Sequence, residues 1–231
     1  MKFENTEVFN FRGALRGMRN PLESWDKSDS RFIKDVDCDG FIETINIGEN
    51  DLKLAQKLIK AGSEHRKFMR QIFVSVDITA PLYWWKEFDT YKVGTVANST
   101  STMHKLASTP ITLDCFEMDD FEDVIFEIGK EDDLEHKYIN SIWSNLLFYL
   151  EILRQKYNET KDKRYWKELI RLLPESWLQK RTVTMDYENL LAICSKGQRR
   201  NHKLTEWSKS FIDWARTLPY AQELIFLDEI L

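Results

Sequence analysis

The segment at residues 69–78, MRQIFVSVDI, constrains the fold most strongly, because apolar side chains alternate along it. An extended chain places successive side chains on opposite faces, so one face would carry Ile72, Val74, Val76 and Ile78. Thr79 can cap a following helix that has Pro81 in its first turn and continues to about Tyr91. The pattern therefore predicts a half-buried strand that leads directly into a helix.

The rest of the chain predicts an α+β fold with three or four strands among five to seven helices. Strands are expected at residues 8–11, 41–47, 124–128 and 181–185. Helices are expected at residues 52–61, 134–157, 165–173, 187–194, 204–218 and 220–230, and Asp186 can cap the fourth of these. The rest of the first forty residues and the stretch 93–104 lack a clear periodicity and are predicted to be irregular.

Length and composition exclude several classes of protein. The chain has 231 residues and a net charge of −5, which favours one domain and argues against a globally basic nucleic-acid binder. Its three cysteines lie far apart, and its four histidines form no closely spaced ligand pair. The start of the chain has no apolar signal core, and no apolar run is long enough to span a membrane. A soluble, cytoplasmic protein is the expectation.

A hydroxyl-rich stretch follows the predicted strand and helix. Lys92 and Lys105 bracket a run of small polar residues that includes Thr95, Asn98, Ser99 and Thr100. Hydroxyl and amide groups beside a cation can hold a phosphate, and Trp84, Trp85 and Tyr91 could stack on a flat ring. The alternative is that the stretch is a solvated connection and that the tryptophans belong to the core.

Two blocks of this sequence resemble the signature regions of the flavin-dependent thymidylate synthase family. In the first block, Ala80-Pro81 ends the strand, KEFD at residues 86–89 stands for R-Q-W-F, and TYK at residues 90–92 stands for R-H-R. Thr95, Ala97, Asn98, Thr100 and Thr102 occupy the later motif positions. In the second block, TMDYENL at residues 184–190 resembles T-V-N-A-R-S-L, and residues 198–206 resemble the family's L-R…H-A-Q-W-E stretch.

The resemblance implies a thymidylate synthase-like fold over residues 1–231, with a divergent segment at 1–50 and an acidic insertion at about 115–133. It implies a homotetramer that binds FAD and a uridylate-type nucleotide such as dUMP, and that uses NADPH and methylenetetrahydrofolate for reductive one-carbon transfer. By position, the expected nucleotide-binding residues are Glu87, Lys92, Asn98, Ser99, Thr100 and Arg199. The expected cofactor-binding residues are His65, Thr90, Tyr91 and Lys92. No catalytic residue and no metal ligand is assigned.

Departures from the family pattern keep other hypotheses open. Asp186 and Glu188 stand where the family has an asparagine and an arginine that contact flavin, and the negative charges would repel a flavin diphosphate. The alternative is a nucleotide-binding relative that does not bind flavin. A third hypothesis is nucleic-acid binding through basic residues near the carboxyl end, but the net charge of −5 argues against it.

Overall fold

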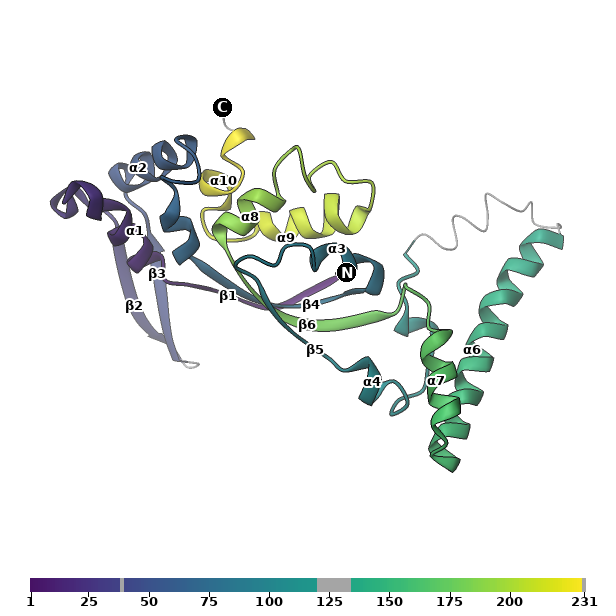
Figure 1. The fold of residues 1–231 in the computed structure, drawn as a ribbon. Helices are drawn as coiled ribbons and strands as arrows, with labels where there is room; N and C mark the ends of the chain where they lie inside the picture. Colours follow the sequence, from purple (N-terminus) through teal and green to yellow (C-terminus); the bar gives the residue numbers. More distant parts are fainter. Residues whose placement is uncertain (38–39, 120–133, 230–231) are drawn as a thin grey trace. The chain divides into compact units, whose positions relative to one another are not determined.

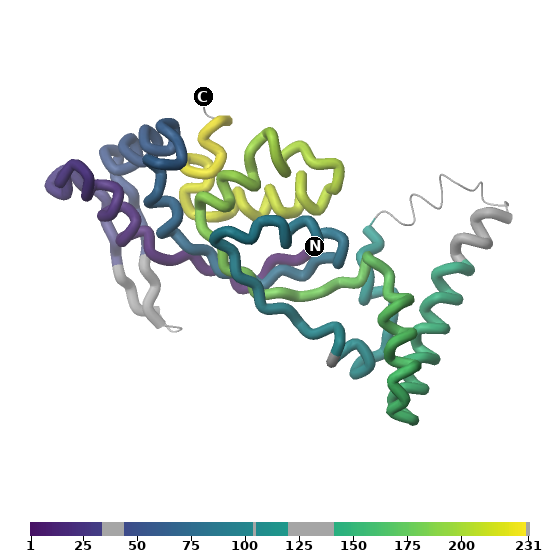
Figure 2. Tube along the Cα trace, viewed as in Figure 1, coloured from purple at the N-terminus to yellow at the C-terminus, as the bar shows by residue number. Residues whose placement is uncertain are grey.

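A computed structural model describes residues 1–37, 40–119 and 134–229 (Figure 1). Figure 2 follows the course of the chain in the same view. Its main sheet has the strand order β1-β4-β6-β5. These strands are β1 (Lys2–Phe9), β4 (Phe73–Pro81), β5 (Val96–Ser99) and β6 (Leu178–Asp186) (Figure 1). A separate antiparallel pair joins β2 (Arg31–Asp37) to β3 (Gly40–Asn46), from Arg31 opposite Asn46 to Asp37 opposite Gly40. Helices accompany both sheets, so the predicted α+β class is confirmed.

The chain divides into two compact units, and β4 and β6 run through both. Unit 1 comprises Met1–Lys2, Ile78–Thr90 and Asn98–Arg181. Its helices are α3 (Leu82–Phe88), α4 (Thr102–Lys105), α6 (Leu134–Thr160) and α7 (Lys163–Arg171), with a 3-10 turn at Leu113–Cys115. One core cluster buries Leu106, Ile111, Phe116, Leu150, Leu153 and Leu169.

Unit 2 comprises Phe3–Asp77, Tyr91–Ala97 and Thr182–Leu231. Its helices are α1 (Phe11–Arg19), α2 (Glu49–Lys60), α8 (Tyr187–Ile193), a π-helix at Glu206–Phe211, α9 (Ile212–Arg216) and α10 (Ala221–Leu224). Short 3-10 turns lie at Asn20–Leu22, Trp25–Lys27, Lys67–Gln71 and Leu227–Glu229. Phe11, Tyr187, Trp207 and Phe211 are fully buried and form much of its aromatic core.

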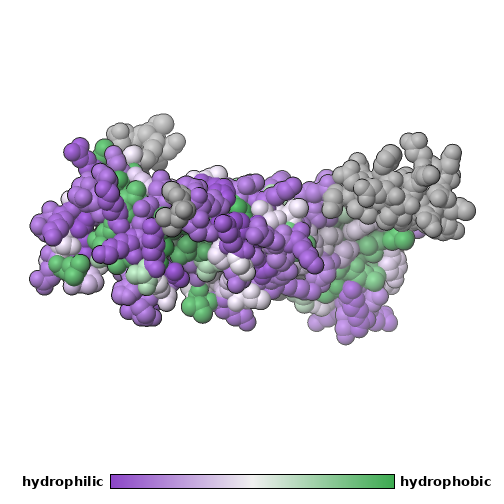
Figure 3. All heavy atoms as spheres, turned by 90° about the horizontal axis from the view of Figure 1, so that it is seen from above, coloured by the Kyte–Doolittle hydropathy of each residue, from purple (hydrophilic) through white to green (hydrophobic). Residues whose placement is uncertain are grey.

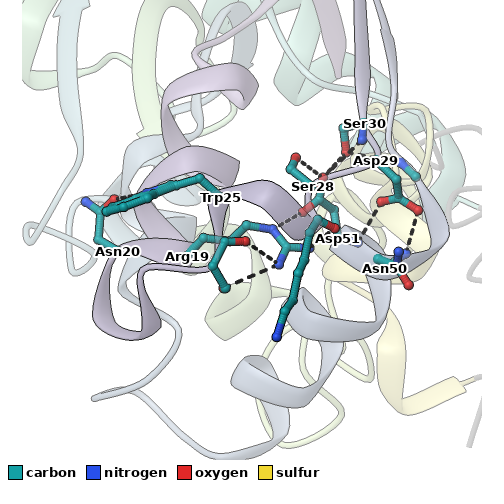
Figure 4. Close-up of polar contacts among 11 residues, drawn as sticks. Arg19, Asn20, Trp25, Ser28, Asp29, Ser30, Asn50 and Asp51 are labelled. Atoms are coloured by element: carbon teal, nitrogen blue, oxygen red, sulfur yellow. Dashed lines mark hydrogen bonds and ion pairs between the residues drawn. The ribbon is translucent and has the colours of Figure 1, made fainter.

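A buried ion pair anchors the amino-terminal segment of unit 2 (Figure 4). Arg19 at the end of α1 donates from Nε to Asp51 in the first turn of α2 at 2.6 Å, and both side chains are almost fully buried. The hydroxyls of Ser28 and Ser30 also donate to Asp51. These partners compensate the cost of burying both charges.

The alternation in β4 was predicted correctly, and its physical basis is visible in the burial. The four side chains of the predicted inner face, Ile72 to Ile78, are completely buried. The strand nevertheless begins at Phe73, because residues 67–71 form a 3-10 turn. Thr79 is not the helix cap as predicted; it stays in the strand, and Pro81 takes that position.

Several predicted boundaries were wrong. The first forty residues are not irregular, since β1 and α1 lie there and α1 buries Phe11, Ala14, Leu15 and Met18. The stretch 93–104 contains β5 and α4. The predicted helix at 204–218 is a π-helix that continues into α9 and ends at Arg216, whereas the predicted helix at 220–230 is reduced to α10 and a 3-10 turn. The predicted strand at 124–128 lies outside the described residues.

Among the described residues, no helix combines the length and apolar character needed to cross a membrane. On the face shown in Figure 3, hydrophobic residues form separate spots within a largely hydrophilic surface.

Candidate functional site

The segment after α3 packs against the first turn of α8 within unit 2. Asn189 donates from Nδ2 to the carbonyl of Val93 at 2.8 Å. Gly94 has a φ of +80°, and a Cβ there would lie 2.9 Å from both Asp186 Oδ2 and Asn189 Oδ1. Only glycine combines this backbone conformation with so close an approach. The loop that carries Tyr91 and Lys92 is thus fixed to α8.

Asp186 caps α8 as predicted. Its carboxylate accepts from the backbone N–H of Asn189 at 2.8 Å, and the side chain of Asn189 accepts from the backbone N–H of Asp186 at 3.1 Å. This reciprocal arrangement satisfies donors that a helix start leaves unpaired. Burial raises the pKa of Asp186, although the hydrogen bonds from the helix backbone oppose that shift.

Arg199 lies against two aromatic rings, those of Tyr91 and Trp207, which also contact each other edge to face. Its Nε donates to the hydroxyl of Tyr91 at 2.9 Å. Its guanidinium carbon lies 4.6 Å from the ring centroid of Trp207 and 5.5 Å from that of Tyr91. Cation–π contacts of this kind restrict a side chain that would otherwise be mobile. The structure therefore brings together two of the predicted site residues, Tyr91 and Arg199, and orients the cation.

Glu188 is not an isolated negative charge. It accepts from Nε of Arg66 at 3.1 Å and also pairs with Arg70. The hydrogen bond from Arg70 to Glu188 raises the pKa of Arg70. Two arginines therefore offset the charge of Glu188, and whether it repels a flavin diphosphate stays a prediction. The same pairing uses Nε of Arg66, and Nε and one terminal nitrogen of Arg70.

The predicted nucleotide residues of unit 1 lie mostly on an exposed edge strand. The side chains of Asn98 and Ser99 in β5 are exposed. Thr100 donates its backbone N–H to the carbonyl of Lys180 at 2.9 Å, and its own carbonyl accepts from Gln179. The backbone N–H of Thr100 is thus already engaged with Lys180, and a contact of its hydroxyl with a nucleotide stays a prediction.

The other predicted residues lie apart from this strand. Glu87 is half-buried on α3, and its carbonyl accepts from the hydroxyl of Thr90 at 2.7 Å. Lys92 is exposed beside Tyr91. His65 is exposed and lines a cavity of about 450 Å³ in unit 2 together with Met18, Leu54 and Phe68. Within the described ranges, no cluster of histidine, cysteine and acidic side chains is placed to hold a metal ion.

Four residues around Arg199 and the start of α8 were not predicted from the sequence: Arg66, Arg70, Asn189 and Trp207. Glu188 and its arginine partners are separated by 122 and 118 residues, so no local pattern connects them. Asn189 could have been found, because it stands three residues after the capping aspartate.

Comparisons with known proteins establish the fold class. No family model matches the chain, and no curated protein matches it by sequence. Solved structures of flavin-dependent thymidylate synthases do match it in fold.

Two of these structures come from Helicobacter pylori and hold the enzyme ThyX with FAD and dUMP. The first has a TM-score of 0.65 at 16% identity and covers 99% of each chain. The second has a TM-score of 0.63 at 15% identity, and covers 99% of this chain and 98% of that one. The chain thus has a ThyX-like fold over nearly its full length.

Proposed function

We propose that this chain binds a uridylate-type pyrimidine nucleotide and carries out reductive one-carbon transfer to it, as a flavin-dependent thymidylate synthase-like protein. The observation that carries the proposal is the placement of Arg199 against the rings of Tyr91 and Trp207, on a fold whose solved examples hold dUMP. Lys92 follows Tyr91 directly and adds a second cation to the same loop. A fixed guanidinium and a nearby ammonium group suit a nucleotide phosphate or a pyrimidine oxygen.

In this proposal, Arg199 and Lys92 bind the nucleotide, and Tyr91 orients Arg199 through its hydroxyl. On unit 1, Glu87, Asn98, Ser99 and Thr100 stay candidate nucleotide contacts by motif position alone, through a carboxylate, an amide and hydroxyls. His65 and Thr90 would contact the cofactor. The proposal also includes a single thymidylate synthase-like domain and a homotetramer. Light scattering of the purified chain tests the tetramer.

The first turn of α8 does not fit the diphosphate of FAD. Its capping position is filled by Asp186, and Glu188 already pairs with Arg66 and Arg70. A helix start attracts anions only while its N–H groups are available. When bound elsewhere in the protein, reduced FAD would supply the hydride, with NADPH as reductant and methylenetetrahydrofolate as carbon donor.

The same observation favours a second candidate function. A protein that binds the nucleotide without flavin needs Arg199, Tyr91 and Lys92. It does not need free N–H groups at the start of α8 to bind a diphosphate. Asp186 and Glu188 are compatible with that function as they stand.

One experiment separates these functions. Purified protein is titrated with dUMP by calorimetry and with FAD by absorbance, and then assayed for dTMP with FAD, NADPH and methylenetetrahydrofolate. Binding of dUMP and FAD with product formation supports the synthase. Binding of dUMP alone supports the flavin-free relative. Failure to bind dUMP would overturn both.

A further inference from the structure

Unit 2 contains a cavity that the proposed function does not use. Neither Tyr91 nor Arg199 lines it. Its volume is about 380 Å³, within the range of small-molecule sites. Its apolar lining comes from three segments of the chain: α2, α8 and the end of the chain after α10. These residues are Ile59, Leu191, Ala192, Ile225 and Leu227.

Three cations and the carboxylate of Asp228 also line this cavity. The cations are Lys60 at the end of α2, Arg66 and Arg200. Arg200 is already neutralised, because both its terminal nitrogens bind Asp228, at 2.8 and 2.9 Å. Lys60 and Arg66 therefore decide the charge that the cavity presents to a ligand.

Arg66 is only partly engaged. It donates from Nε to Glu188 at 3.1 Å, and a guanidinium has four further N–H donors on its terminal nitrogens. Glu188 is shared with Arg70. Lys60 is exposed at the end of α2. The cavity wall thus combines an apolar floor with a net positive rim.

We propose that this cavity binds a small organic monocarboxylate, with the carboxylate at Lys60 and Arg66 and the apolar body against Leu191, Ile225 and Leu227. Ser195 adds a hydroxyl at the lining. The apolar surface supplies affinity by excluding water, and the two cations select the anion over a neutral molecule of the same shape. This inference does not depend on the proposed nucleotide function.

Octanoate is a suitable probe, and octanamide is its neutral counterpart. Calorimetry on the full chain is expected to show one octanoate per chain, with octanamide at least tenfold weaker. Ala192 is exposed at the lining, so Ala192→Trp is expected to fill the cavity and abolish binding without disturbing the core. Circular dichroism checks that each variant is folded.

The charge selectivity is tested by Lys60→Gln, which should weaken octanoate about tenfold and leave octanamide unchanged. Lys57→Gln is the matched control, because Lys57 is exposed on the same helix and does not line the cavity. The proposal is overturned if octanoate does not bind, if octanamide binds equally well, or if Ala192→Trp leaves the affinity unchanged.

Discussion

Arg199 donates a hydrogen bond to the hydroxyl of Tyr91 across 108 residues of sequence. The arginine follows α8 and the tyrosine follows α3, so the contact exists only in the folded chain. It brings together one residue from each of the two blocks that resemble the thymidylate synthase family.

Removing either side of this arrangement should weaken nucleotide binding. We expect Arg199→Ala and Lys92→Ala each to lower the dUMP affinity about tenfold, because each removes a charge-assisted contact. Tyr91→Phe should lower it only a few-fold, since it removes the orienting hydroxyl and keeps the ring. Calorimetry provides the measurement, and the exposed Lys196→Ala is the control. Unchanged affinity in Arg199→Ala would exclude this arginine from the nucleotide site.

Gly94 should be hard to replace. Its positive φ and its approach to Asp186 and Asn189 predict that Gly94→Ala lowers the free energy of unfolding by about 2–3 kcal/mol. Urea denaturation measures the change. Gly62 separates the two causes, because its φ is +105° but a Cβ at that position would meet no atom within 4 Å. Gly62→Ala should therefore cost about 1–2 kcal/mol, and equal costs at both positions would contradict the role of close approach.

Glu188 should control the affinity of the α8 region for phosphates. Glu188→Gln releases Arg66 and Arg70 from a carboxylate, so we expect several-fold tighter binding of inorganic pyrophosphate and of FAD. Fluorescence or calorimetric titration measures it. Glu64→Gln removes one negative charge from an exposed pair with Lys67 and serves as control. Weaker binding in Glu188→Gln would show that the carboxylate itself assists the ligand.

Acid should destabilise the amino-terminal segment through Asp51. Burial alone would raise the pKa of Asp51, but hydrogen bonds from Ser30, Ser28 and Arg19 outweigh it, so the pKa lies below the ordinary 3.8. A lowered pKa in the folded state gives stability that is present above the unfolded pKa and lost as the pH falls through the folded one. Stability should therefore drop below about pH 4.

Asp51→Asn tests this pH dependence. It should lose about 3–5 kcal/mol at pH 7, because Arg19 is left buried without its partner. It should also show a flatter dependence of the urea midpoint between about pH 3 and pH 7. Asp26→Asn, at an exposed position of the same segment, should behave like the unaltered chain. A variant that keeps the full acid sensitivity would shift the cause to other carboxylates.

The two cysteines whose surroundings are described should differ in reactivity. Burial raises the pKa of the Cys194 thiol to about 12, while Cys115 is only partly buried. Since the thiolate is the reactive form, iodoacetamide at about pH 8 should modify Cys115 in the native protein and leave Cys194 unmodified. Peptide mass spectrometry distinguishes the sites, and denaturation in urea should make Cys194 react. Modification of native Cys194 at a similar rate would contradict its burial.

Local sequence patterns correctly predicted those helices and strands whose formation depends on residues close together in the chain. The alternation of β4, the Asp186 cap and the long helix α6 could all be predicted, because each depends on neighbours within a few residues. Helix α1 could not, since Gly13 and Gly17 disfavour a helix that tertiary burial of Phe11 and Leu15 stabilises. Strand β5 has exposed side chains and gains its structure from pairing in the sheet, which its own sequence does not indicate.

The candidate site likewise contains some residues that the sequence predicted and others that it did not. Tyr91, Lys92 and Arg199 were selected by position in the motif, and the Tyr91–Arg199 contact agrees with that selection. Their roles toward a ligand stay predictions, as do those of Glu87, Asn98 and Ser99. The arginines that bind Glu188 were not predicted, because their pairing depends on how the 3-10 turn before β4 and the start of α8 are brought together.

The fit between Gly94 and the α8 cap has a consequence for evolution. Any relative that carries a side chain at position 94 must give up the aspartate–asparagine pair or move the loop, because the space is already filled. These three positions should therefore vary together among relatives. A sequence that keeps all three is expected to keep the loop packed on the α8 cap, even where its other residues differ widely from those of this chain.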